Sequence, residues 1–491
     1  MPGRSAPYRL EAESLMLGGR PARRLRWLLA IAFCSVTGAC AHDVDLRQHG
    51  QVSGTSAASD YATDTPGPAD LVIDGATLHQ TMDGWGVGAR VFSDGHVHEG
   101  SSYVIPATAR DEMLDRLFLP GTGVANPGLG LIRVRLWMDN YSQTGWNSAF
   151  DFTNKRGEFQ VDEILIPGQK GGRQLKEWYL SFTRFEHWMG HTIPRPAYWA
   201  KYIKAHIDYL TRRGVPPTHA DVLNEPPDEI PEGWLADTNA ELAKLLKGTG
   251  IQQTGPQAQS CDASARRAKE IISNRAADAA IQILTYHTYD GPAPGWDNCA
   301  RLRDLAARSG KKTWMSEYSL EPTFGFRDPF DFAVYIHRIV NEVGSSGFDF
   351  QLAWLVEKKY PAIQSALLIL PNSGATYTNF TAAGVYWVYG QFTRFVPKGS
   401  IRVEASSSKR SMPVSAFKVD GRPVIVVTNN GSDTTASFSI SGFQPVSRLR
   451  PIRTSTTETW TNLADVVVEN GSFSAVLPGK TVTTFVADDP D

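Results

Sequence analysis

The sequence predicts an α/β protein in which a (β/α)8 barrel carries a small β-sandwich domain. From residue 71 to about residue 397, strand-like and helix-like segments alternate along the chain, which is typical of a parallel sheet closed into a barrel. From residue 398 onward, short β-like runs alternate with polar turns and show no helical period, a pattern that favours a sandwich. A chain of 491 residues, 42% hydrophobic and 20% charged, is long enough for both domains and is not composed like a disordered or multi-span membrane protein.

Each element expected in the barrel, residues 81–397, has a local reason. The expected strands are apolar runs at residues 131–136, 219–223, 281–289, 312–316 and 349–356. The expected helices show apolar residues at the helical period and occupy residues 198–213, 264–273, 299–308 and 332–343. Ser264 is expected to be the N-cap of the second helix. Gly214, Gly310 and Gly344 follow the other three helices, where glycine commonly ends a helix.

The sandwich is expected over residues 398–491. Its clearest strands are the alternating runs at residues 416–419, 423–428, 436–440 and 481–486. Residues 69–80, ahead of the barrel, are also strand-like, so we expect them to join this domain. Both ends of the folded chain would then contribute to the sandwich.

The first 39 residues resemble an export signal. An arginine-rich stretch ends at Arg26, and residues 27–39 carry no charge, a run too short to span a bilayer but suited to the apolar part of a signal peptide. Two endings stay open, either an A-x-A cleavage site at residues 39–41 or a loose lipobox with Cys40 as the acylated first mature residue. The pair Arg23-Arg24 also permits a twin-arginine signal. We therefore expect an exported protein that is periplasmic, anchored to the outer membrane or secreted.

The mature chain is expected to be acidic and tethered. Residues 1–39 hold six Arg and two Glu, so the rest of the chain has a formal net charge of −6. That charge disfavours nucleic acid and anionic lipid as partners, and membrane contact is expected only through a lipid on Cys40. Residues 40–68 are rich in Ser, Thr, Asp, Gly and Pro, which is typical of a flexible tether. We expect a monomer.

Two cysteines remain after the signal and the possible lipid site are set aside. Cys261 and Cys299 are expected to form a disulfide because the chain is exported, and the alternative is two free thiols. They lack the Cys and His neighbours of a zinc site. No metal ion and no cofactor are predicted.

Two glutamates follow predicted barrel strands. Glu225 comes after strand 219–223, and Glu317 comes after strand 312–316. Reactive groups in such barrels lie at the carboxyl ends of the strands, and a pair of opposed carboxylates is what glycoside cleavage requires. Pro226 and Pro227 turn the chain away from the strand, which would hold Glu225 at the rim.

These motifs resemble clan A glycoside hydrolases, and within that clan glycoside hydrolase family 30. Asn-Glu-Pro at residues 224–226 and the later strand-end Glu317 match its fourth and seventh strands. Residues 82–88 are similar to the family's first-strand glycine motif, residues 131–136 to its second strand, and residues 386–399 to its last helix and exit into the side domain. The resemblance covers roughly residues 70–488. Residues 164–170, taken as the third-strand region, lack the family's usual motif there.

The resemblance implies a retaining mechanism with assigned roles. Glu225 would be the acid/base and Glu317 the nucleophile. Asn224 would hydrogen-bond the 2-hydroxyl group of the sugar. Arg133 and Arg135 share one face of their strand, and one of them should keep Glu317 ionised; the family pattern favours Arg133.

Further residues would line the substrate site. The resemblance implies that His287 and Tyr289 form the sixth-strand pair beside the nucleophile and that Trp354 forms the floor of the −1 subsite. Residues after the second strand are further candidates for the sugar subsites, namely Trp137, Asp139 and Asn140. Trp85 and Trp178 fit a subsite and the core equally.

The expected function is therefore an exported retaining glycoside hydrolase that cleaves a β-linked glycan such as xylan, β-1,6-glucan or β-1,6-galactan. Two alternatives stay open. The first is another clan A glycosidase, such as an exo-acting arabinofuranosidase or glucosidase, with the same carboxylates in a closed pocket. The second is a non-catalytic surface lipoprotein that binds glycans. The sequence does not decide between endo and exo action.

Overall fold

The computed structural model of the chain describes residues 69–89, 105–121, 127–138, 143–152, 160–289, 296–319, 328–356, 366–370 and 379–487. They form a closed eight-stranded barrel and a separate ten-stranded sheet, which confirms the predicted fold class. The expected export signal, the tether and Cys40 lie outside the described residues. Among the helices in this part of the chain, none combines the length and apolar character that crossing a membrane requires.

The barrel strands are all parallel and follow the chain order. They are β2 (Gly84–Ala89), β3 (Arg133–Met138), β4 (Glu177–Phe182), β5 (His219–Ala220), β6 (Gln252–Ala258), β7 (Ile281–His287), β8 (Lys312–Tyr318) and β9 (Gly347–Gln351). β9 pairs with β2, from Gly84 opposite Gly347 to Gly88 opposite Gln351, and this pairing closes the barrel. The carboxyl ends of all eight strands therefore meet on one face.

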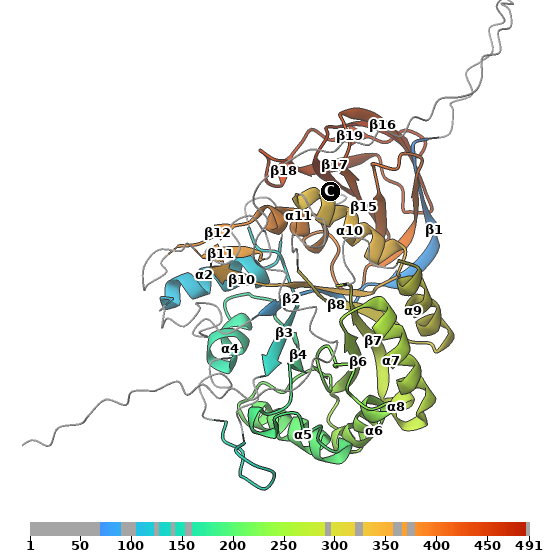
Figure 1. Ribbon diagram of the computed structural model, residues 1–491. Helices are drawn as coiled ribbons and strands as arrows, with labels where there is room; N and C mark the ends of the chain where they lie inside the picture. Colours follow the sequence, from blue (N-terminus) through green and yellow to red (C-terminus); the bar gives the residue numbers. More distant parts are fainter. Residues whose placement is uncertain are drawn as a thin grey trace, which may run out of the picture. The chain divides into compact units, whose positions relative to one another are not determined.

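The helices lie around this barrel (Figure 1). They are α2 (Ala107–Phe118), α4 (Ile166–Gly168), α5 (Pro196–Arg212), α6 (Trp234–Leu246), α7 (Cys261–Ser273), α8 (Arg275–Ala280), α9 (Trp296–Arg308), α10 (Pro329–Asn341) and α11 (Gly384–Thr393). α5 illustrates why they form, since a proline stands in its first turn and Trp199, Ile203 and Leu210 all point into the core. A π-helix, η1 (Gln160–Leu165), and a 3-10 turn, η2 (His187–Met189), complete the set.

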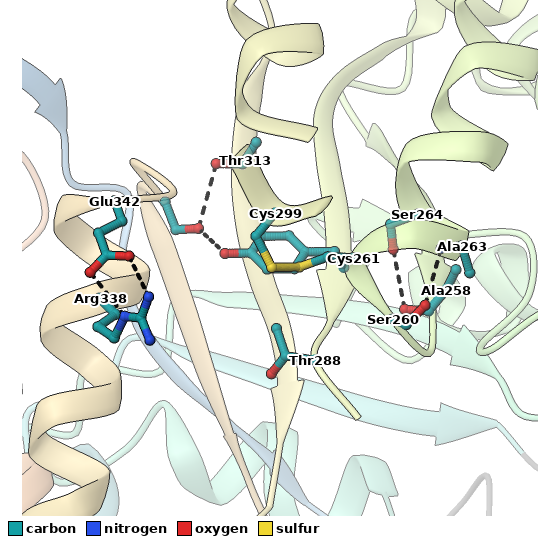
Figure 2. The surroundings of a disulfide bond; sticks show 12 residues. Ala258, Ser260, Cys261, Ala263, Ser264, Thr288, Cys299, Thr313, Arg338 and Glu342 are labelled. Carbon is teal, nitrogen blue, oxygen red and sulfur yellow. Dashed lines mark hydrogen bonds and ion pairs between the residues drawn. A yellow bond between two sulfur atoms is a disulfide. The ribbon is translucent and has the colours of Figure 1, made fainter. Parts of the chain in front are cut away.

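Three local expectations were wrong. Residues 349–356 are not one strand, because the barrel strand β9 ends at Gln351 and Trp354–Val356 form a strand of a separate small sheet. Residues 164–170 do not form the third barrel strand, because they lie at the end of η1 and in α4; the third strand is β4. Ser264 is not an N-cap, because α7 begins three residues earlier, and the Ser260 hydroxyl accepts the Ala263 N–H at 3.0 Å. The Ser264 hydroxyl instead donates to the carbonyl of Ala258, at the end of β6, at 3.2 Å (Figure 2).

The second sheet is built from both ends of the described chain. β1 (Leu71–Thr81) runs antiparallel to β13 (Ile401–Ser407) and parallel to β16 (Thr434–Ser441), so the blue strand in Figure 1 lies among the red ones. The other members are β14 (Val414–Val419), β15 (Arg422–Asn429), β17 (Arg448–Thr454), β18 (Thr461–Asn462), β19 (Val466–Val467), β20 (Ser472–Leu477) and β21 (Thr481–Ala487). The sheet curls around its own apolar core.

The sheet and the barrel also contact each other. α10 and α11 pack against strands of the curled sheet, and the buried His337 ring of α10 hydrogen-bonds the hydroxyl groups of Ser415 at 2.7 Å and Thr428 at 3.0 Å. Three further short strands form a separate small sheet, β10 (Trp354–Val356), β11 (Leu368–Leu370) and β12 (Thr381–Ala382).

The glycine motif of β2 makes room for side chains inside the barrel. A Cβ on Gly86 would lie 2.0 Å from the Asp349 carboxylate, and a Cβ on Gly88 would lie 2.5 Å from the Trp137 ring. Asp349 is fully buried and accepts from the Arg133 guanidinium at 2.9 Å. The motif therefore exists because a buried ion pair and an indole ring occupy the space beside the strand.

The disulfide joins two helices on the outside of the barrel. Cys261 at the start of α7 and Cys299 in α9 are bonded (Figure 2), with Cα atoms 4.9 Å apart. Both residues are fully buried. The bond connects the helices that follow β6 and β7, the two strands that carry Gln257 and His287.

Replacing Gly86 with alanine should destabilise the fold. The new methyl group must displace Asp349 from Arg133, and disrupting a buried ion pair costs roughly 3–5 kcal/mol. Chemical unfolding of G86A against the parent protein measures this loss. Gly145→Ala is the matched control, because a Cβ there meets nothing within 4 Å; equal stability of the two variants would contradict the packing argument.

Removing the disulfide should lower the free energy of unfolding by about 4 kcal/mol, the loop-closure value for a sequence separation of 38 residues. The test is the double variant Cys261→Ala and Cys299→Ala, unfolded with and without a reductant. Reductant should destabilise the parent protein and leave the double variant unchanged. If the reductant leaves the unfolding midpoint of the parent protein unchanged, the disulfide does not contribute to stability.

Candidate active site

The two strand-end glutamates lie close together on the carboxyl-end face of the barrel. One oxygen of Glu225, one oxygen of Glu317 and a ring nitrogen of His287 lie within 4.8 Å of one another. Glu225 belongs to the segment after β5, Glu317 lies near the end of β8, and His287 ends β7. Strands far apart in the sequence thus bring two carboxyl groups to one point.

Glu225 is held by its backbone as well as its side chain. Its φ angle is +44°, in the left-handed region that residues other than glycine seldom adopt. Its backbone N–H donates to the Gln257 carbonyl at 2.8 Å, and its Oε1 lies 2.9 Å from His287 Nδ1. The side chain is 29% exposed, and Oε2 has no hydrogen bond within the described part of the chain, so one oxygen faces the open side of the site.

Glu317 is buried and ion-paired. Arg135 Nη1 contacts its Oε2, and the Tyr289 hydroxyl donates to its Oε1 at 3.3 Å. Burial acts to raise the pKa of Glu317, but the Arg135 guanidinium, with His287 and Tyr289, outweighs burial and holds the pKa below its usual value. The carboxylate is therefore ionised and ready to attack an electrophile.

Asn224 is oriented by the same guanidinium. Its Oδ1 accepts from Arg135 Nη2, and its backbone N–H donates to the Phe182 carbonyl at 2.8 Å. Because Oδ1 is used, the Nδ2 amino group is left as a donor, and it has no hydrogen bond to the described residues. An amide N–H beside an ionised carboxylate can donate a hydrogen bond to a hydroxyl group of a ligand bound there.

The arginine beside Glu317 is Arg135, and the expectation for Arg133 was wrong. Arg133 lies nearer the amino ends of the strands, where it bonds Asp349 at 2.9 Å and Glu177 at 3.3 Å and stacks on the Trp314 ring at 4.0 Å. Both arginines are fully buried. The period of two placed them on one face, but their depth in the barrel depends on strand stagger, which the sequence does not reveal.

The remaining candidates divide between the site and the core. His287 and Tyr289 contact the two glutamates as described. Trp137 is nearly buried, with Arg135 Cζ 4.8 Å from its ring centre, and Trp354 is 1% exposed in β10, just after the last barrel strand. Asp139 and Asn140 lie outside the described residues.

Two tryptophans that fitted either role belong to the core. The Trp85 indole N–H donates to the Val396 carbonyl at 2.7 Å, and that of Trp178 to the Val215 carbonyl at 3.3 Å. Both side chains pack within the main apolar cluster.

Sequence reasoning missed two buried polar residues behind the acid/base candidate. Asp221 is fully buried, and its Oδ2 accepts from Gln257 Nε2 at 3.1 Å. Burial raises the pKa of Asp221 to about 7, against the lowering effect of Arg135. Asp221 lies four residues before Glu225, so an acidic residue inside an apolar strand was the one available signal; Gln257 offered none.

The close cluster does not fit a metal centre. Glu225, His287 and Glu317 are near enough to share a cation. However, His287 Nε2 lies 3.0 Å from Gln257 Oε1 and its Nδ1 lies against Glu225, so both ring nitrogens are engaged. Glu317 is already paired with Arg135. Protein partners thus take both ring nitrogens of His287 and the charge of Glu317.

Comparisons with known proteins agree with this architecture. No known sequence-family model matches the chain. Among solved structures, it is similar to a glycoside hydrolase family 30 subfamily 8 xylanase from Clostridium acetobutylicum, at 21% identity and a TM-score of 0.64, covering 86% of this chain and 100% of that one. It is similar to the catalytic domain of a family 30 xylanase from Talaromyces cellulolyticus, at 18% identity and a TM-score of 0.65, with 85% and 100% covered.

A third similar structure is an endo-β-1,6-glucanase, at 15% identity and a TM-score of 0.64, covering 86% of this chain and 94% of that one. The resemblance to the family 30 fold is thereby confirmed. At these identities the likeness establishes the fold, and the chemistry has to be argued from the site.

Substituting Asp221 with asparagine should remove a pH dependence of stability. The pKa of Asp221 is raised from 3.8 to about 7 in the folded chain, so between these values the folded state binds more protons than the unfolded state, and stability falls as pH rises. The full effect is about 4 kcal/mol. Chemical unfolding at pH 4.5 and pH 8 should therefore show D221N gaining stability over the parent as pH rises, and a constant difference would contradict the raised pKa.

Proposed function

We propose that the protein is a retaining β-glycoside hydrolase of the family 30 kind. The observation that carries the proposal is the pair Glu225 and Glu317, with carboxyl oxygens within 4.8 Å of each other. Retaining glycosidases have carboxyl groups ~5–5.5 Å apart, whereas inverting enzymes leave room for a water between them. The unequal surroundings of the two groups support two different roles.

In the first step, Glu317 attacks the anomeric carbon and forms the glycosyl–enzyme ester, while the bond from that carbon to the leaving oxygen breaks. Glu225 gives its proton to that oxygen. Arg135 supports the attack because it keeps Glu317 ionised in a buried position. Asn224 Nδ2 would donate to the sugar 2-hydroxyl group, a contact that strengthens in the transition state; the bond of Asn224 Oδ1 to Arg135, which leaves Nδ2 as the donor, supports this role.

In the second step, a water attacks the anomeric carbon and displaces Glu317, and Glu225 takes the proton of that water. Microscopic reversibility requires the same residue to act as acid and then as base. The exposed Oε2 of Glu225 is the oxygen that can reach both the leaving group and the water. The step returns both carboxyl groups to their starting states.

The proposed substrate is a β-linked polysaccharide or oligosaccharide of the xylan, β-1,6-glucan or β-1,6-galactan type. Similar structures include xylanases and an endo-β-1,6-glucanase, which supports these glycans as the first to test. The charge and apolar pattern of residues 1–40 supports export, with or without a lipid on Cys40. We propose that the enzyme acts as a monomer without a cofactor.

A non-catalytic glycan-binding role is the second candidate. A binding protein has no need of a buried, ionised carboxylate, because burying the charge costs desolvation free energy. In an enzyme, such a carboxylate can serve as the nucleophile. An exo-acting clan A glycosidase would use the same residues and would differ in its products.

To test this proposal, the protein from residue 42 onward is incubated with glucuronoxylan, β-1,6-glucan, β-1,6-galactan and aryl β-glycosides, and the released products are measured. Glu317→Gln should abolish turnover, because the amide cannot form the ester. Glu225→Gln should slow unactivated glycans roughly 10²–10⁴-fold, the usual contribution of general acid–base catalysis, and should slow aryl glycosides with good leaving groups less. Product sizes separate endo from exo action.

Glu229→Gln is the matched control, since Glu229 is exposed in the same segment as Glu225 and should tolerate the change. The binding role would be established instead if the folded parent protein and the Glu317→Gln variant bound a glycan equally well and neither released products. Hydrolysis that survives Glu317→Gln would refute the assigned nucleophile.

A further inference from the structure

A chain of hydrogen bonds runs behind the acid/base residue and ends at a buried carboxyl group. From the site inward it links Glu225 to His287 at 2.9 Å, His287 to Gln257 at 3.0 Å, and Gln257 to Asp221 at 3.1 Å. His287, Gln257 and Asp221 are buried. The roles argued above for the two glutamates leave Gln257 and Asp221 without a task.

Gln257 reaches this position through a bulge in β6. Pro256 pairs with Thr285 and Ala258 pairs with Tyr286, so Gln257 is the extra residue between them. Its φ angle is +56°, and its carbonyl receives the Glu225 N–H. Backbone strain of this kind persists only where surrounding contacts enforce it, and it gathers at functional sites.

The neighbours of Gln257 determine the orientation of its amide group. Asp221 Oδ2 accepts from Nε2, and the Ser316 hydroxyl donates to Oε1 at 2.9 Å. Above about pH 7, where Asp221 is ionised, reversing the amide would set its oxygen against a carboxylate. Oε1 therefore faces His287, and a carbonyl oxygen can only accept.

His287 Nε2 must then carry a hydrogen. In the neutral ring this leaves Nδ1 as a bare acceptor, directed at Glu225 Oε1. We propose that Gln257, oriented by Asp221, is a positioning residue that fixes the Nε2–H tautomer of His287 and thereby keeps the acid proton at the contact between Glu225 Oε1 and His287 Nδ1. This inference rests on the proposed role of Glu225.

The charged groups around the contact are compatible with a single shared proton. Glu317 Oε2 lies 3.9 Å from His287 Nε2 and is paired with Arg135. Tyr289 donates to Glu317 rather than to the histidine. Asp221 bonds Gln257 and also interacts electrostatically with Arg135 and Glu317. No described arginine or lysine is bonded to Glu225; its hydrogen-bonded titratable partner is His287, with Glu317 within 4.8 Å.

The tautomer matters in both steps of the reaction. In the free enzyme, the bare Nδ1 accepts the proton carried by Glu225 Oε1. For catalysis, rotation of the carboxyl group must bring the protonated oxygen to the open side of the site, where it donates to the glycosidic oxygen. Once the proton has gone to the leaving group, Nδ1 directs its lone pair at the new Glu225 carboxylate. That repulsion favours proton uptake from the attacking water, which restores the first state.

The first measurement uses the parent protein, labelled with ¹⁵N-histidine and assigned by comparison with His287→Gln. Above about pH 7, where Asp221 is ionised, the His287 ring should show a protonated Nε2 and an unprotonated Nδ1. A proton on Nδ1, or on both nitrogens, would overturn the proposal. This readout needs no substrate, so it stands even if no glycan is cleaved and the proposed function fails.

The second measurement uses Gln257→Met, which removes both amide contacts at nearly constant volume. With no acceptor at Nε2, the His287 proton should move to Nδ1 and donate to a Glu225 carboxylate. The basic limb of the kcat/KM profile should then lie at least one pH unit lower than in the parent protein. At pH values above the shifted limb, activity should be about tenfold lower, and KM should change little. The role of Gln257 would be refuted if Gln257→Met changed neither the His287 tautomer nor the basic limb of the kcat/KM profile.

Gln253→Met is the matched control, since Gln253 is buried on the same strand and bonds Asn239 at 3.1 Å, away from the site. A rescue variant combines Gln257→Glu with Asp221→Asn. In this variant the side chain at position 221 becomes the hydrogen-bond donor and the side chain at position 257 the acceptor. The pair keeps one carboxyl group, and position 257 again presents an acceptor to His287 Nε2. The double variant should recover the tautomer and the basic limb, whereas a purely structural role predicts no recovery.

Discussion

The site depends on one interaction, the ion pair between Arg135 and Glu317 inside the barrel. A carboxylate without water is unfavourable unless an opposite charge and hydrogen bonds replace its hydration. Arg135 is fully buried and supplies both, since it contacts Glu317 with one nitrogen and Asn224 with another. The same guanidinium therefore sets the ionisation of Glu317, the proposed nucleophile, and the orientation of Asn224, next to the proposed acid/base Glu225.

A second buried arginine performs a different task two residues earlier. Arg133 and Asp349 form the lower layer of charge in the barrel, and Gly86 leaves the space that their pair occupies. The upper layer, around Arg135, opens toward the carboxyl ends of the strands. One layer supports the closed barrel and the other supports the chemistry, so the alternation of inward side chains on β3 serves both.

Strained backbone connects Glu225, the proposed acid/base, with Gln257 behind it. Glu225 and Gln257 both have left-handed φ angles, and the N–H of the first donates to the carbonyl of the second at 2.8 Å. Such conformations cost of order 1–3 kcal/mol each. The barrel, with its disulfide between the helices after β6 and β7, supplies the rigidity that holds them. The strain places Glu225 at the rim and directs Gln257 inward toward His287.

Local sequence patterns were enough to predict the fold class and the strand-end positions of Glu225 and Glu317, because strand and helix periods are local properties. The sequence also pointed to His287, Tyr289 and Asn224. It misassigned the third strand, since an apolar run does not reveal whether it is a strand or a helix turn. Only the tertiary structure decided that Arg135 rather than Arg133 meets Glu317, because depth in a barrel depends on strand stagger. The positions of Asp221 and Gln257 likewise depend on a bulge and on contacts across strands, which no local pattern records.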